Sequence, residues 1–137
     1  MKKLAALLIV LTIVLSISVA YADIQSTINS RIRTTYDAVS VTKIDVNTSI
    51  ETEKKIVLAY LKWDRDNSLE QSRKMISMYS EDLAAYITQS YDDCERICVF
   101  WELPKMYKLD GQPDAKVMFD CKGNAAYFHS ATGSLFY

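Results

Sequence analysis

The feature that most constrains the fold is a change of residue pattern near Glu95. Before this point apolar residues recur at spacings of three and four, which is typical of helices. After it the apolar segments are short, rich in aromatic and β-branched residues, and separated by turn residues. They predict strands near 97–103, 115–121, 125–130 and 134–137. Helices followed by an antiparallel meander define an α+β domain.

The part before Glu95 carries several helix signals. An apolar stripe predicts a helix over residues 24–39, although β-branched residues also allow an extended run over 39–46. Capping-box pairs at Thr48 and Glu51 and at Asn67 and Glu70 predict helices over 49–64 and from residue 67. Ser80, followed by two acidic residues, predicts a further helix start.

We therefore expect three or four N-terminal helices followed by a small antiparallel sheet. In element order this arrangement resembles the NTF2-like and cystatin-like folds, in which helices pack into a curved sheet. The resemblance implies, as an alternative, a cone-shaped domain with a cavity between helices and sheet.

The first 22 residues have the layout of a secretory signal peptide. Two lysines precede an apolar run, and small residues, Ala20 and Ala22, stand where a signal peptidase would require them. We expect cleavage after Ala22 and a periplasmic or secreted protein that starts at Asp23. The alternative is an uncleaved anchor, since the apolar run is close to the length that spans a bilayer.

Removal of the leader would leave about 115 residues, the size of one domain. That domain, residues 23–137, would carry a charge of about −3, and its basic residues are scattered along the chain. This balance argues against nucleic acid as a partner. Once the leader is cut, we expect no stable membrane span.

The chain has three cysteines, and export would permit a disulfide. Cys94 and Cys98 are poorly spaced for a bond to each other on either a helix or a strand. We predict a bond between Cys98 and Cys121 across a hairpin that turns near Asp110, with Cys94–Cys121 as the alternative. Either bond would stabilise the fold by about 3 kcal/mol.

The remaining thiol, Cys94 in the first pairing, lies among acidic residues that disfavour its thiolate. It is either inconsequential or a route to a disulfide-linked dimer. A less favoured hypothesis joins Cys94, Cys98, Cys121 and His129 into a Cys3His metal site. Against it stands the oxidising compartment, and we predict no metal and no cofactor.

The sequence contains no catalytic motif. His129 is the only histidine available as a base, and no glycine-flanked nucleophile elbow accompanies any serine. The acidic clusters do not select a pair of carboxylates for glycosidase chemistry. Whether the chain is an enzyme stays uncertain, and the balance favours that it is not.

Aromatic residues are concentrated in the second half, where 11 of the 15 fall between Tyr79 and Tyr137. Alternate strand positions would present Trp101, Tyr107, Tyr127 and Tyr137 as a binding face. We therefore predict a small exported, non-catalytic binding domain that offers an aromatic sheet face to a protein or an envelope component. The alternatives are an NTF2-like domain for a small ligand, with or without catalysis, and a metal-binding protein.

Overall fold

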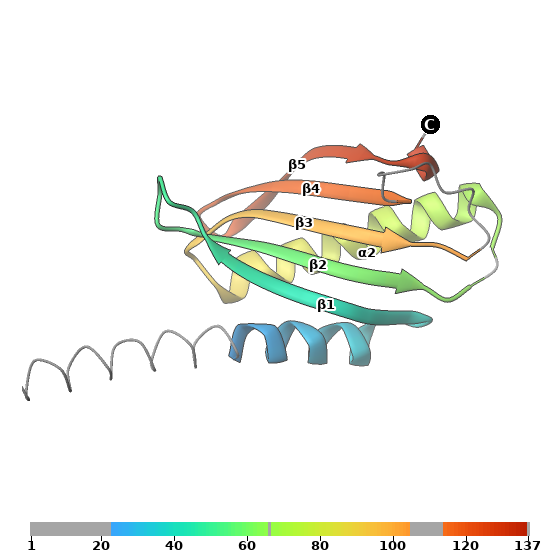
Figure 1. Ribbon diagram of the computed structural model, residues 1–137, viewed down its shortest axis with the longest axis horizontal. Coiled ribbons are helices and arrows are strands. Elements are labelled where there is room, and N and C mark those ends of the chain that lie inside the picture. Colours follow the sequence, from blue (N-terminus) through green and yellow to red (C-terminus); the bar gives the residue numbers. More distant parts are fainter. Residues whose placement is uncertain (1–22, 66, 105–113, 137) are drawn as a thin grey trace, which may run out of the picture.

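A computed structural model describes residues 23–65, 67–104 and 114–136. Within these ranges the chain forms two α-helices and one five-stranded sheet. Figure 1 shows how these elements are arranged. A first helix covers residues 23–35. The elements that follow are β1 (Val39–Thr48), β2 (Lys55–Trp63), α2 (Leu69–Ser90), β3 (Cys94–Glu102), β4 (Ala115–Lys122), β5 (Ala125–Thr132) and a short 3-10 helix (Ser134–Phe136).

The strands lie in the sheet in chain order, β1-β2-β3-β4-β5. Neighbouring strands are antiparallel except β2 and β3, which are parallel. A parallel pair needs a long crossover connection, and α2 supplies it by running back behind the sheet (Figure 1). The sheet is therefore a β1–β2 hairpin joined at its centre to a β3–β4–β5 meander.

The expectation of three or four N-terminal helices is wrong, because two strands stand between the two observed helices. The helix predicted over 49–64 is instead a turn followed by β2. Within that turn the Ser49 carbonyl accepts from the backbone N–H of Glu53, whose φ is 59°. The Thr48–Glu51 pattern thus belongs to the end of a hairpin. The element order behind the NTF2-like and cystatin-like resemblance is not the one observed.

The two helices predicted from residues 67 and 80 are one helix, α2. Its N-cap is Ser68, whose hydroxyl accepts from the backbone N–H of Gln71. Ser80 does not start a helix. It is fully buried in the middle of α2, and its Oγ accepts a 3.0 Å hydrogen bond from the Trp101 indole N–H.

Most of the predicted strands agree with the structure. The extended run over 39–46 and the strands near 97–103, 115–121 and 125–130 are confirmed as β1, β3, β4 and β5, with ends that differ by a few residues. The strand predicted over 134–137 is wrong, since Ser134–Phe136 forms a 3-10 turn. The leader, residues 1–22, and the predicted hairpin turn near Asp110 lie outside the described residues.

The core lies between the helices and one face of the sheet. Its helical side is formed by residues at helical spacing, Ile24, Ile28 and Ile32 from the first helix and Ile76, Leu83 and Ile87 from α2. Polar contacts tie the helices together. The Tyr36 hydroxyl donates to the Asp82 carboxylate at 2.6 Å, and the Arg31 guanidinium lies 4.7 Å from the centre of the Tyr86 ring.

Candidate functional site: the open face of the sheet

The two faces of the sheet have different surroundings. One face, here called the covered face, packs on the helices through alternate strand residues that include Val57, Val99 and Val117. The opposite face, here called the open face, carries the intervening residues. No described element packs over it (Figure 1). Side chains there are half-buried or exposed, with the exception of Cys98.

An aromatic pair flanked by two lysines crosses the open face from strand to strand. Tyr60 of β2 and Phe100 of β3 are register partners, and their rings stack with centroids 4.6 Å apart and planes 7° from parallel. The Lys43 ammonium lies 5.8 Å from the Tyr60 ring centre, and the Lys116 ammonium lies 5.4 Å from the Phe100 ring centre. We call these four residues the Lys–aromatic row.

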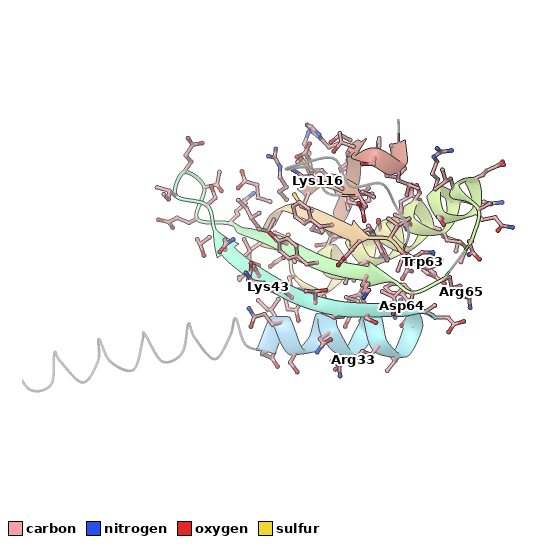
Figure 2. The ribbon with its side chains drawn as sticks, turned by 45° about the vertical axis from the view of Figure 1, so that its right-hand side comes forward. Arg33, Lys43, Trp63, Asp64, Arg65 and Lys116 are labelled. Atoms are coloured by element: carbon pink, nitrogen blue, oxygen red, sulfur yellow. The ribbon has the colours of Figure 1, made fainter. Side chains whose placement is uncertain are left out.

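The register of the strands sets the order in which these four residues cross the sheet. Lys43 pairs with Tyr60, Tyr60 with Phe100, and Phe100 with Lys116. Figure 2 labels Lys43 and Lys116 on β1 and β4, the strands that flank the two bearing the rings. Cations above ring faces are attracted by the aromatic quadrupole, so the row is a pre-arranged element of the surface.

A second row on the open face is apolar. Leu58 of β2, Cys98 of β3 and Met118 of β4 are consecutive register partners. Cys98 is buried between its neighbours, and this burial raises the pKa of its thiol. Together with the stacked rings, these side chains give the open face an apolar centre.

Charged residues surround this centre. The Arg96 guanidinium pairs with Asp120 at 3.2 Å, and Lys43 pairs with Asp45 at 3.1 Å. Among the described strand residues, alternation places five cations on this face, Lys43, Lys62, Arg96, Lys116 and Lys122, against three carboxylates, Asp45, Glu102 and Asp120. The open face therefore carries an excess of positive charge, although the chain as a whole is slightly acidic.

The four aromatic residues singled out from the sequence do not form one surface. Trp101 is only 2% exposed and lies in the core, where it donates to Ser80. Tyr127 is 55% exposed and pairs with Asp120 on the open face. Tyr107 and Tyr137 lie outside the described residues. The structure thus places Tyr60 and Phe100, which sequence reasoning did not select, at the centre of the face.

The structure brings Cys94 and Cys121 together and separates Cys98 from both. All three are thiols, and the Sγ atoms of Cys94 and Cys121 are 3.8 Å apart on the covered face. Cys98 points to the open face opposite Met118. The expected hairpin register, which would have set Cys98 near Cys121, differs from the observed one by three residues.

The hydrogen bond between the two close sulfurs sets their acidities. Together with burial and the charge of Asp93, it raises the pKa of the Cys94 thiol, and it lowers the pKa of Cys121.

The four residues of the less favoured Cys3His metal hypothesis do not lie together in the structure. Cys98 faces away from Cys94 and Cys121, while His129 lies on β5, where its Nδ1 is 3.1 Å from the Ser130 hydroxyl. Among the described residues no group of three or more His, Cys, Asp or Glu side chains is placed to hold a metal ion.

Two hollows lie beside the helices, and the second reaches the edge of the open face at Lys43. One, of about 270 Å³, lies between α2 and the β4–β5 pair and is lined by Phe128, Val117 and Glu81 among others. The other, of about 430 Å³, is a polar groove between the first helix and β1, lined in part by Asn29 and Arg33. Both are open to solvent, and neither has the buried carboxylate that an NTF2-like catalytic pocket would require.

Neither a family model, nor a curated protein, nor a solved structure matches the chain. In the described part of the chain, no helix combines the length and the apolar character needed to cross a membrane. Functional inference therefore rests on the geometry of the open face and of the cysteine pair.

Proposed function

We propose that the protein is a small exported, non-catalytic binding domain whose open sheet face docks a protein partner. The observation that carries the proposal is the Lys–aromatic row, in which Tyr60 and Phe100 stack on an uncovered face between two lysines. Aromatic side chains supply large contact area at low entropic cost, and they dominate the energetics of many interfaces.

The arrangement of the face indicates the chemistry of the partner. Its apolar centre of Leu58, Met118 and the stacked rings requires an apolar counterpart. Its excess of cations favours a surface with acidic side chains placed around that counterpart, because opposite charges speed encounter and exclude wrong partners. The occupant we propose is a protein segment in which acidic residues flank aromatic or aliphatic ones.

A defined probe tests this proposal. A library of random displayed peptides would be selected on the folded domain, and the affinities of enriched peptides measured by titration at low and at physiological salt. We expect enriched sequences to combine Asp or Glu with apolar residues. Replacement Phe100→Ala should weaken their binding at least about tenfold, and Lys116→Glu should act in the same direction.

The matched control is Met78→Ala. Met78 is 50% exposed on α2 and lies outside the open face, so its truncation should leave peptide affinity unchanged. Enriched peptides that bind Phe100→Ala as well as the wild type would place the binding surface elsewhere. Tight, salt-sensitive binding of a single-stranded oligonucleotide to the row would assign the face to nucleic acid and overturn the proposal.

A further inference from the structure

Two buried thiols meet on the covered face, at the end of the sheet where β3 begins and β4 ends. Cys94 is 3% exposed and Cys121 is 8% exposed, and their sulfurs are 3.8 Å apart although the residues lie 27 positions apart in the chain. Both belong to the main apolar core, whereas Cys98 does not.

A local irregularity produces this meeting. Along β3, Arg96 and Cys98 point to the open face, so strict alternation would point Cys94 there too. The register between β2 and β3 shifts at Glu95, where Lys55 pairs with Cys94 but Ile56 pairs with Arg96. The extra residue turns Cys94 to the covered face, beside Cys121 one step beyond the Arg96–Asp120 pair.

We propose that Cys94 and Cys121 are a disulfide site, and that Cys98 remains a thiol when the protein is oxidised. An S–S bond is about 2.05 Å long, so the sulfurs must approach each other from their present separation, and residues on neighbouring strands lie within the span that such a bond tolerates. Cys98 is excluded because its side chain leaves the sheet on the opposite face.

The reaction needs an oxidant of the disulfide class, such as glutathione disulfide or a dithiol–disulfide oxidoreductase. The thiolate of one of the two cysteines attacks one oxidant sulfur, and the oxidant's S–S bond breaks to release the first thiol. The other cysteine then loses its proton and attacks the protein sulfur of the mixed disulfide, releasing the second thiol. Two protein thiols are oxidised to one disulfide, and one oxidant disulfide is reduced to two thiols.

The disulfide would link two segments that are far apart in the sequence, the end of the α2 crossover and the β4–β5 hairpin. Cys94 opens β3 directly after the α2 crossover, and Cys121 lies just before the turn into β5. Oxidation would hold the crossover against the β4–β5 hairpin without contact to the open face. The inference therefore does not rest on the proposed binding function, and each can fail without the other.

The test is oxidative refolding of residues 23–137 from the reduced, denatured state in a glutathione redox buffer, so that burial does not shield the thiols. The product is alkylated in denaturant and mapped by mass spectrometry of its peptides. Before alkylation we expect a monomer about 2 Da lighter than the reduced chain. After alkylation we expect one alkylated cysteine, Cys98, and a linked peptide pair containing Cys94 and Cys121. Its thermal midpoint should exceed that of the reduced protein by about 10 °C or more.

Three variants sharpen the result. Cys98→Ser should form the same bond, while Cys94→Ser and Cys121→Ser should refold without an intramolecular bond. Circular dichroism of each variant shows whether it has folded. Folded wild-type protein with three alkylated cysteines, or with Cys98 in its main crosslink, would overturn the assignment.

Discussion

The covered and open faces of the sheet are built from adjacent residues of the same strands, yet they have opposite physical roles. On β3, Val99 is fully buried against the helices, whereas its neighbour Phe100 is half-buried beside solvent and stacked on Tyr60. The covered face supplies the apolar burial that stabilises the fold. The open face carries aromatic and cationic groups that do not contribute to the core, and this difference is the basis for proposing it as the binding surface.

The largest expected loss of stability comes from a charge introduced on the covered face, and the same charge on the open face provides the comparison. Val99→Asp buries an unpaired carboxylate and should cost more than about 4 kcal/mol of unfolding free energy, a large fraction of the stability of a small domain. Phe100→Asp loses the stacking contact with Tyr60 and places its carboxylate beside Lys116, so it should cost only about 1 kcal/mol. Urea unfolding followed by fluorescence measures both. Equal losses at the two positions would show that the open face is part of the core.

A smaller effect is expected from the polar contact between Trp101 on the covered face and Ser80 in the middle of α2. Trp101→Phe removes the indole donor and leaves the Ser80 hydroxyl buried without it, at a cost of about 2 kcal/mol. Adding Ser80→Ala to that variant should recover part of the loss. A double-mutant cycle measures the coupling, and strictly additive losses would mean that the hydrogen bond contributes nothing.

The smallest effect concerns the helical side of the core at alkaline pH. Burial, followed by the hydrogen bond to Asp82, raises the pKa of Tyr36 far above its ordinary value of 10.0. Above pH 10 the unfolded chain loses this proton and the folded chain keeps it, so stability falls as pH rises, by at most about 1.4 kcal/mol per pH unit from this residue.

Tyr36→Phe removes this contribution. The variant should be less stable than the wild type at neutral pH, and the difference should narrow between pH 10 and 11 when urea midpoints are compared. A difference that stays constant over that interval would show that the Tyr36 hydroxyl is not held protonated by the fold.

Sequence patterns predicted the meander because its strands alternate and are bounded by turn residues. They failed where the same residue type is compatible with two different structural roles. Ser80 has the composition of a helix cap but is a buried acceptor for Trp101, and Thr48 with Glu51 imitates a capping box at the end of a hairpin. The segment "KIVLAYLKW" is apolar on both strand faces, so its periodicity also fits a helix.

The ambiguity between helix and strand over β2 also explains why sequence patterns do not identify the candidate site. A helical interpretation of β2 assigns Tyr60 to the core, and the prediction of Trp101 as a surface residue excludes its neighbour Phe100, the residue that stacks on Tyr60. A shift of one residue exchanges the faces of a strand. The proximity of Cys94 and Cys121 depends on the shift of the β2–β3 register at Glu95, and no local residue pattern predicts this shift.

The parallel pairing at the centre of the sheet also has a consequence for folding kinetics. The β1–β2 hairpin and the β3–β4–β5 meander each join strands that are near in sequence, and can form quickly. Their union pairs residues such as Leu58 and Cys98, about 40 positions apart, and requires closure of the loop that contains α2. The docking of the hairpin on the meander is therefore expected to be the rate-limiting step of folding.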